Sequence, residues 1–499
     1  MTFFQHAMDD PKLSGIRSSA DNFVIPRDLK FQVKWKDGDK ENPRTWPIWY
    51  RSYIVAVMSL STTIVAMYTT IYTSAVNGMQ KEFEVPPTII VLGLTTNLFG
   101  IAFGSVLLSS VSEIYGRRPL YLISVFLFGV FILPVALAQN VETILISRFF
   151  AGVFAGSIMS NSPGSVTDVT DDRYRALAIS CWSLGAMNGS VLGAIIGGFV
   201  YQYLGWRWIN WLVLICSGVN FLLIALVKET YTPSLLRKRT KKIQEETGDQ
   251  RWWCHYDHKE AVNGSQIIKT NLGRPIHMMF FEPICVFWNL YLGVVYAVLF
   301  LCFVAYPIVF KQLRGWAPGL AGLGYCGIGT GSVIAVISEP LIRRIIAMHS
   351  PDPGTGHPAP EAAVFAVGIG SVLIPLGEFA FAWTAQPSTI HWIFPILAGI
   401  PFGLGNCLVF IYATNYIAGS YREYATSALA GNTIVRFGLA GLLPLAGSKM
   451  YSTLGANWAG TTLALIEVML IPIPFVFYKY GHRIRKRSRL IEKRSEGSG

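Results

Sequence analysis

A short charged motif occurs twice in the chain, each time after an apolar stretch. Its members are Glu113, Gly116, Arg117 and Arg118 in the first copy and Glu339, Arg343 and Arg344 in the second. The glycine permits a tight turn, and the arginines can pair with the nearby acid, with lipid phosphate or with carbonyls at a helix C-terminus. A charge contact that forms in only one of two conformations biases the equilibrium between them. We therefore interpret the motif as a gate, with simple anchoring of a membrane loop as the alternative.

Four ionisable residues lie inside long apolar runs, where each needs an explanation. A cation within a membrane helix costs about 2.5 to 3.5 kcal/mol on insertion scales, so Arg148 must face water, a counter-charge or carbonyl groups. We expect it to face a central cavity, where it could assist proton coupling or attract an anionic or polar substrate. Arg436 is a second candidate of the same kind. Glu378 and Glu467 are possible proton sites, or protonated side chains bonded to a neighbouring helix.

The apolar runs predict an all-α membrane protein. The 499 residues are 52% hydrophobic and only 14% charged, whereas soluble proteins carry about a quarter charged residues. Twelve runs approach or exceed the length of about 20 residues that spans a bilayer. They are Tyr50 to Ser74, Ile89 to Val111, Leu120 to Ala138, Ile144 to Val166, Leu177 to Tyr201, Ile209 to Val227, Pro283 to Phe310, Ala317 to Ser338, Ala362 to Trp383, Ile390 to Tyr412, Ala425 to Ser448 and Trp458 to Tyr478. The repeated motif predicts two pseudo-symmetric six-helix bundles with a site between them.

This organisation divides the chain into five parts. An N-terminal tail (1–49), a six-helix bundle (50–227), a central loop (228–282), a second six-helix bundle (283–478) and a basic tail (479–499) follow one another. Lys and Arg concentrate in the tails, the central loop and alternate connections, which predicts that both termini are cytosolic. Topology, together with contact between the basic tail and anionic lipid, explains the net charge of +12 without nucleic-acid binding. We expect the plasma membrane, with the vacuolar membrane as the alternative.

One of the runs, Leu177 to Tyr201, carries glycines at four-residue spacing. Gly189, Gly193 and Gly197 line one helix face, and Gly198 lies beside the last of them. Small residues at this spacing let two helices approach closely. The pattern predicts a tight seam on which helices pivot, or close packing without a further role.

Aromatic and amide side chains in other runs could line a substrate cavity. The candidates are Tyr68, Tyr72, Trp182, Asn188, Tyr296, Phe303, Tyr306, Asn406, Tyr412 and Asn415. Rings offer apolar contact while amides fix a few polar groups, a lining that suits amphipathic organic molecules. Individual tyrosines could instead belong to the aromatic belt at the membrane surface.

Other chemistries lack their sequence signals. The chain has no Gly-x-x-x-x-Gly-Lys-Ser/Thr loop for ATP, and no Gly-x-Ser-x-Gly turn or His-Glu-x-x-His helix for hydrolysis. Cys254, His255 and His258 lie close together, but no second cluster completes a metal site. We therefore expect no enzyme activity, no cofactor and no metal.

These motifs resemble signatures of the major facilitator superfamily. Ser112 to Arg118 is similar to its loop signature, in which an acid precedes Gly-Arg-Arg, with Glu113 where many members have Asp. Ser147 to Gly152 is similar to the fourth-helix signature, in which the arginine, here Arg148, faces the cavity. The resemblance implies the major facilitator fold.

Further segments narrow the resemblance to the fungal twelve-helix drug:proton antiporters, the group of multidrug and polyamine exporters. They include Glu41 to Pro47, Gly205 to Trp208, Glu229 to Tyr231, Arg274-Pro275, Glu282-Pro283, Tyr306-Pro307, Asn415-Tyr416 and Ser427 to Ala430. The glycines of Leu177 to Tyr201 match the antiporter signature in part, because Ser190 and Ala194 stand where fungal drug exporters usually carry proline.

The resemblance implies a secondary transporter that exports small amphipathic compounds such as drugs, toxins or secondary metabolites, in exchange for protons and by alternating access. Its partners would be the small-molecule substrate, protons and membrane lipid. Polyamines are less expected, because the cavity runs lack acids to pair with amines. The nearest alternative is an importer or exporter of an organic anion or nutrient, which Arg148 and Arg436 would suit. A non-transporting membrane receptor is the second alternative.

Overall fold

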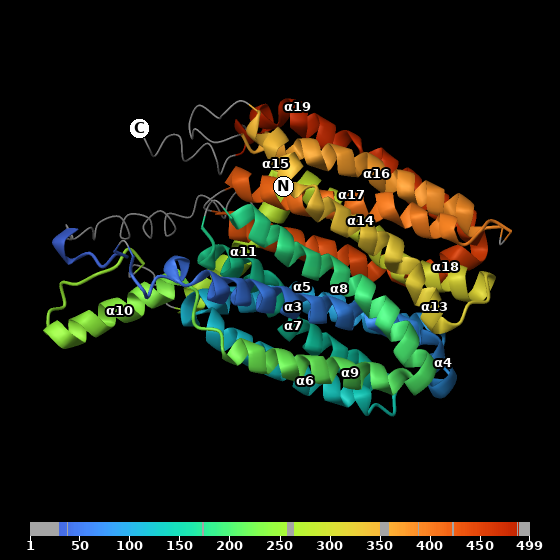
Figure 1. Ribbon diagram of the computed structural model, residues 1–499, viewed down its shortest axis with the longest axis horizontal. Coiled ribbons are helices and arrows are strands. Elements are labelled where there is room, and N and C mark those ends of the chain that lie inside the picture. The colour runs from blue at the N-terminus through green and yellow to red at the C-terminus, as the bar shows by residue number, and fades with distance from the viewer. Residues whose placement is uncertain are drawn as a thin grey trace, which may run out of the picture.

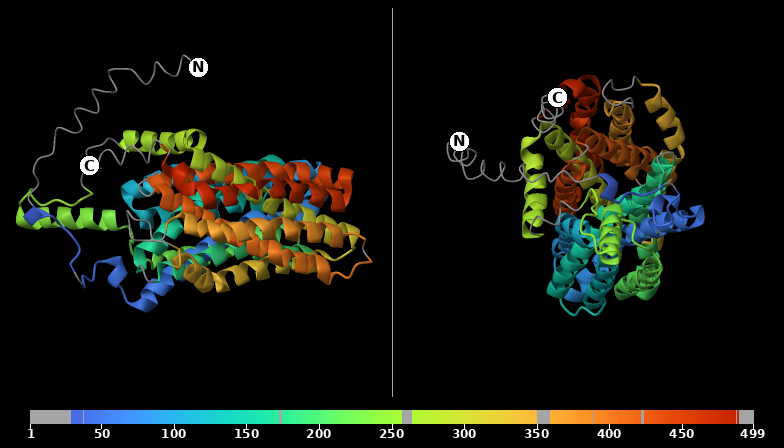
Figure 2. Two further views of the ribbon diagram at one scale, coloured as in Figure 1. Left: turned by 90° about the horizontal axis from the view of Figure 1, so that it is seen from above. Right: turned by 90° about the vertical axis from the view of Figure 1, so that its left-hand side faces the viewer.

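The computed structural model describes residues 29–486 and Ser488, apart from residues 37, 172–173, 257–263, 350–358, 388 and 422–423. Within this part, twelve helical segments are long and apolar enough to cross a membrane, which confirms the predicted all-α membrane architecture. The helices run along one common axis (Figure 1). Seen end-on, the two halves of the chain form two adjacent groups of helices (Figure 2).

The N-terminal half supplies the first six spans. They are α3 (Ile48–Ile71), continued by η3 (Tyr72–Ala75) and α4 (Val76–Phe83), then α5 (Pro87–Tyr115), α6 (Arg117–Ala136), α7 (Val141–Val169), α8 (Arg175–Leu204) and α9 (Trp206–Ala225). Local sequence sets their ends. Asn140 caps α7 by accepting a 3.0 Å hydrogen bond from Thr143 N. Gly116 and Gly205 take φ values of 95° and 85° at the sharp connections that follow α5 and α8, a region that favours glycine.

The C-terminal half supplies the other six spans. They are formed by α12 (Pro283–Pro307) with the π-helix η5 (Ile308–Leu313), α13 (Pro318–Gly322) with η6 (Leu323–Tyr325) and α14 (Cys326–Ile337), α16 (Glu361–Ala385), α17 (Ile393–Tyr421), α18 (Ala425–Leu470) and α19 (Pro472–Lys486). A short helix, α15 (Glu339–Ala347), follows α14. Gly455 has a non-helical φ of 75° inside α18, so α18 contains the eleventh span and the start of the twelfth. The last two predicted runs are therefore joined by a kink.

Helix packing follows the same scheme in both halves. In the first half α3 packs against α8 and α5 against α7, and in the second half α12 packs against α18 and α14 against α17. Between the halves, α5 packs against α18, while α8 packs against α13 and α14. Helices two and five of one half thus meet helices eleven and eight of the other, as expected for a pseudo-symmetric pair.

The halves contact each other at one end of the molecule and near its middle. The first and last described residues lie at the end that carries α10 (Thr232–Thr247), here called the α10 end, and α4 and α13 lie at the opposite α13 end (Figure 1). At the α13 end, Gly319 N donates a 3.0 Å hydrogen bond to Gln202 Oε1. Nearer the middle, Thr95 Oγ1 donates to Gly441 O over 2.7 Å. The halves are therefore in direct contact through α8 and α13 at the α13 end.

The central loop holds two helices and is tied to the N-terminal segment. Val33 N donates a 2.8 Å hydrogen bond to Trp253 O, and Arg239 on α10 forms an ion pair with Asp39. The hydrogen bond from Arg239 holds the pKa of the Asp39 carboxyl below its usual range. The second loop helix, α11 (Gly264–Phe281), packs against α5, α12 and α18. The loop thus contacts both halves at the α10 end.

We expect Gly198→Ala to open the α13 end. A Cβ at Gly198 would lie 2.4 Å from Pro318 O, so the added methyl group must push the halves apart. The rate at which a hydrophilic maleimide labels Ser190→Cys, deep between the halves, should rise roughly tenfold, which corresponds to about 1.4 kcal/mol. Gly218→Ala is the matched control, because a Cβ there meets nothing within 4 Å. Equal labelling rates in the two variants would contradict the assignment of Gly198 to the contact between the halves.

Candidate gating and substrate site

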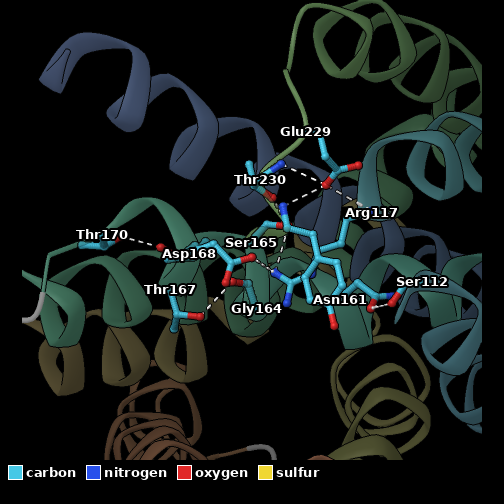
Figure 3. A network of polar contacts seen from close by, with 12 residues as sticks. Ser112, Arg117, Asn161, Gly164, Ser165, Thr167, Asp168, Thr170, Glu229 and Thr230 are labelled. Carbon is cyan, nitrogen blue, oxygen red and sulfur yellow. Dashed lines mark hydrogen bonds and ion pairs between the residues drawn. The ribbon is translucent and has the colours of Figure 1, made fainter. Parts of the chain in front are cut away.

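The first copy of the charged motif forms a network at the α10 end (Figure 3). Arg117, the first residue of α6, places Nη1 2.6 Å from Asp168 Oδ2 on the last turn of α7. Glu229, which follows α9, accepts hydrogen bonds from Arg117 N (3.2 Å) and Arg118 N (3.0 Å). The motif therefore ties α6, α7 and the end of α9 together within the N-terminal half.

Two glycines leave space for the carboxylate of Glu229 and the guanidinium of Arg117, and a tyrosine ring packs beside that guanidinium. A Cβ at Gly116 would lie 2.6 Å from Glu229 Oε2, and a Cβ at Gly164 would lie 2.6 Å from Arg117 Nη2. The ring of Tyr231 lies 5.1 Å from Arg117 Cζ. Burial raises the pKa of Tyr231 to about 12, so this ring is neutral and contributes a cation–π contact.

Arg118 makes one of the contacts that the sequence suggested. Its Nη2 donates a 3.1 Å hydrogen bond to Ala225 O at the C-terminus of α9, where a cation is favoured by the helix dipole. The main-chain oxygen of Glu113 accepts a 3.0 Å hydrogen bond from Arg237 Nη2 on α10. The loop helix α10 is thereby attached to the same network.

The second copy of the motif has a different geometry. Arg343 Nε lies 3.6 Å from Glu339 Oε1 within α15, and the Arg343 side chain is half exposed. Arg344 is also exposed, whereas Glu339 is buried. Ile342 stands where the first copy has the turn-forming Gly116, and the chain continues through it as the helix α15. In the described part of the chain, this copy therefore makes no link between spans like that of Arg117.

Arg148 lies on α7 and is completely enclosed in the N-terminal half, with 0% of its surface exposed. Its Nε donates a 2.7 Å hydrogen bond to Gly93 O, and its Cζ lies 4.5 Å and 4.0 Å from the ring centroids of Tyr68 and Tyr72. Its Nη1 has no hydrogen-bond partner, and no acid pairs with it among the described residues. The cation is thus stabilised by carbonyl groups and ring faces, two favourable environments for a desolvated guanidinium.

A small central cavity of about 20 Å³ lies between the halves. Its walls come from α8 on one side and from α12, α14 and α17 on the other. Three of the predicted substrate contacts line it, namely Tyr296, Phe303 and Asn406. This volume holds about one water molecule, so the centre is nearly shut in this conformation.

Arg436 lies on α18, behind the wall of the central cavity. Its Cζ is 4.6 Å from the ring centroid of Tyr296, and the rings of Phe410 and Phe437 lie at 4.9 Å and 5.0 Å. Nε has no hydrogen-bond partner. Tyr296 lines the central cavity, whereas Arg148 and the two rings that contact it, Tyr68 and Tyr72, do not.

Trp182 and Asn188, two more predicted cavity residues, lie on α8. Trp182 Nε1 donates a 2.9 Å hydrogen bond to Ser162 Oγ on α7. Asn188 faces α14, where a Cβ at Gly329 would lie 3.2 Å from its Oδ1. Asn188 therefore lies at the surface on which the halves meet, whereas Trp182 is bonded within its own half.

The other predicted cavity residues lie in the C-terminal half. Tyr306 is buried and stacks on Phe381 with ring centroids 4.4 Å apart. Tyr412 is buried on α17, and Asn415 is exposed one turn further toward the α10 end. The structure thus distributes the ten predicted residues over several environments, and only part of the set meets at the centre.

The glycines of α8 form the seam that their spacing predicted. A Cβ would lie 2.6 Å from Thr63 O at Gly189, 2.7 Å from Met67 O at Gly193, 2.7 Å from Ile71 Cγ1 at Gly197 and 2.4 Å from Pro318 O at Gly198. The first three therefore pack on α3 of the same half. Gly198 alone packs on the other half, so α8 joins a seam within the first bundle to the contact between the bundles.

A larger cavity of about 440 Å³ lies at the α13 end and is here called the vestibule. It is lined by η3, α4 and α5 of the first half, and by α12, η5 and α18 of the second. Among the residues that the structure describes, Lys311 on η5 is the one charged residue of this lining, beside several amides and hydroxyls. Glu378 and Glu467, the predicted proton sites, are buried in the C-terminal half.

Two important members of the network were not among the predicted site residues. Asp168 lies 51 positions after its partner Arg117, so no local pattern connects them. Glu229 belongs to the segment Glu229 to Tyr231, whose only signal in the sequence is its resemblance to the fungal antiporters. Its short spacing to the basic helix α10 gave no hint that it would bind the start of α6.

Comparison with known proteins gives consistent matches along the chain. The sequence profile of the Major Facilitator Superfamily matches residues 58–443. A citrinin biosynthesis cluster MFS transporter of Monascus ruber is 34% identical over 500 residues, covering 99% of this chain and 97% of that protein. An MFS-type efflux pump of Trichophyton rubrum is 35% identical over 459 residues, covering 92% and 77%. A partially occluded inward-open structure of the Escherichia coli xylose transporter XylE has the same fold, with a TM-score of 0.64, 16% identity and coverage of 87% and 98%.

We expect Arg117→Gln to lower the unfolding temperature, because Asp168 loses its only ion-pair partner among the described residues. The free energy of unfolding should fall by about 2 kcal/mol. This is less than the roughly 3 to 5 kcal/mol lost when a fully buried pair is broken, because 14% and 21% of these two side chains remain exposed. The double variant Arg117→Gln/Asp168→Asn should recover part of the lost stability, because it leaves no unpaired carboxylate. Arg207→Gln is the control, because its pair with Glu82 is 40% and 39% exposed. Equal losses in both single variants would contradict the role of the network.

Proposed function

Because this chain belongs to the major facilitator superfamily, we propose that it exports small amphipathic organic compounds in exchange for protons. The family consists of transporters, so the protein is a multi-pass membrane transporter and not an enzyme. The cargo class, the direction and the coupled ion are the parts that we propose.

The observation that carries the export proposal is the full-length similarity to fungal relatives. One of these is named as a transporter of a biosynthesis cluster and another as an efflux pump, and both match over more than nine-tenths of this chain. A biosynthesis cluster needs its product moved out of the cell or into a compartment. We therefore propose a secondary metabolite or toxin as cargo, and the plasma membrane as the site.

The lining of the central cavity supports an amphipathic cargo. Tyr296, Phe300 and Phe303 offer ring faces, and Asn406 and Ser332 offer polar groups. Such a surface binds an apolar ring system and fixes a few of its polar substituents. Because the cavity is nearly shut, a cargo molecule must separate the halves in order to bind.

Alternating access gives the two ends their roles. The halves are in contact at the α13 end through α8 and α13, and the Arg117 network holds the α10 end of the N-terminal half together as one unit. The concentration of Lys and Arg in α10 and around Arg117 and Arg118 supports a cytosolic position for the α10 end. Cargo would enter from that side and leave through the vestibule once the contact at Gly198 opens.

Transport of an organic anion is the second candidate. Arg436 lies directly behind Tyr296, and Lys311 is a charged residue in the wall of the vestibule. These cations could bind a carboxylate or acidic phenol on its way out. The same arrangement would serve an importer if the proton and the anion moved together.

Dye transport in proteoliposomes tests the proposal. Purified protein should move rhodamine 6G against its gradient when a proton gradient is imposed, and a protonophore should abolish this movement. Arg148→Ala should reduce the initial rate roughly tenfold, the effect of about 1.4 kcal/mol, because the Tyr68 and Tyr72 rings lose the cation between them. Arg207→Gln, on the exposed pair, should transport normally. Carboxyfluorescein moved in place of rhodamine 6G would favour the anion candidate, and movement of either dye without the gradient would contradict proton coupling.

A further inference from the structure

A group of buried polar side chains lies where α12, α16 and the second part of α18 pack together. Glu378 on α16 and Glu467 on α18 are 2% and 3% exposed. Glu378 Oε2 lies 3.8 Å from Cys302 Sγ on α12. A Cβ at Gly460 would lie 3.5 Å from Glu378 Oε1, so this carboxyl group points at α18 about two turns before Glu467. Helical side chains lean toward the N-terminus of their helix, which directs Glu467 back toward Glu378.

Several polar atoms of this group have no hydrogen-bond partner. They are both carboxyl oxygens of Glu467, Oε1 of Glu378 and the hydroxyl oxygens of Tyr291 and Tyr451. In the part of the chain that the structure describes, neither carboxyl group has a Lys, Arg or His partner. A buried carboxylate without a partner is strongly disfavoured, and two neighbouring carboxylates disfavour each other's charge. The unpartnered oxygens are therefore sites for a proton.

The group has a route to the α13 end. Tyr451 is one of the residues that line the vestibule, and its hydroxyl group interacts electrostatically with Glu378 and Cys302. The π-helix η5 lines the same vestibule, and such helices are frequent at functional sites. A proton in the water of the vestibule would thus meet Tyr451 first and Glu378 next.

We propose that Glu378 and Glu467 form a proton-binding pair that exchanges with the vestibule past Tyr451. The inference rests on the proposed function, because it names the carrier of the antiported proton. In the binding step an O–H bond forms on a carboxylate oxygen, the carboxylate loses its charge, and release breaks the same bond without any electron transfer. The other titratable groups that face the pair are Cys302, Tyr291 and Tyr306 from α12 and Tyr451 from α18.

The position of the pair connects it to the cargo site. Cys302, which contacts Glu378, is followed directly by Phe303, and Phe303 lines both the central cavity and the vestibule. A charged carboxylate and a neutral carboxyl group need different neighbours, so a change of protonation alters how α12 can pack beside Glu378. Protonation would therefore act on the wall between the cavity and its exit, although the pair itself lies outside the cavity.

Infrared difference spectroscopy of the purified full-length protein tests the pair without any cargo. The C=O stretch of protonated carboxyl groups is followed from about pH 5 to about pH 9, a range that buried carboxyl groups can reach. We expect this band to disappear reversibly in the wild type. Each glutamine variant should lose the part of the band that its replaced carboxyl group contributes, and the part that remains in Glu378→Gln should titrate at lower pH, because the neighbouring carboxylate charge is gone. Glu245→Gln, an exposed position on α10, is the matched control and should resemble the wild type.

The same spectra decide the access route and can overturn the proposal. Exchange of the band after transfer to heavy water should slow at least fivefold in Tyr451→Phe, and an unchanged rate would reject the route past Tyr451. If the wild type and the two glutamine variants give the same pH-dependent spectrum, the pair does not exchange protons and the proposal fails. Dye export with no such titration rejects the pair but keeps the exporter, whereas titration without export keeps the pair and rejects the cargo class.

Discussion

A charge inside a membrane protein must be enclosed by other protein groups, and this constraint shapes every part of the present site. Water is excluded from most of the bundle, so each ionisable side chain needs ring faces, carbonyls, an opposite charge or a proton. Different groups surround the ionisable side chain at each position. Arg148 has ring faces and carbonyl groups, and Arg117 has an acid. Among the described residues, the carboxyl groups of Glu378 and Glu467 have neither a cation nor a full set of hydrogen bonds.

These contacts also show which parts of the molecule are tied together. The Arg117 network and the glycine seam between α3 and α8 hold the N-terminal half together. Contacts between the halves are fewer and rest on glycine backbone, such as Gly198 against Pro318 and Thr95 against Gly441. Such contacts contain no buried charge, so they can separate without exposing one to lipid. Rigid halves with an uncharged joint are what alternating access about a central site requires.

The sequence predicted much of the architecture because lipid imposes a simple pattern on it. Twelve apolar runs were sufficient to predict the twelve spans, and the resemblance of Ser112 to Arg118 and of Ser147 to Gly152 to known signatures predicted the family. The glycine spacing on α8 predicted a close helix contact. The partners were harder to predict. Asp168 and Glu229 lie far from Arg117 in the sequence, and only the fold brings them together. The enclosure of Arg148 by Tyr68 and Tyr72 also depends on how α3, α5 and α7 pack, which no local pattern encodes.

Alternating access is the central claim, and distances between spin labels at both ends test it most directly. Labels at Tyr203 and Leu320 report on the α13 end, and labels at Tyr115 and Ile337 report on the α10 end, since all four side chains are exposed. When rhodamine 6G and a proton gradient are supplied to protein in vesicles, the first distance should lengthen in the same fraction of molecules in which the second shortens. Two distances that stay fixed, or that lengthen together, would contradict the account.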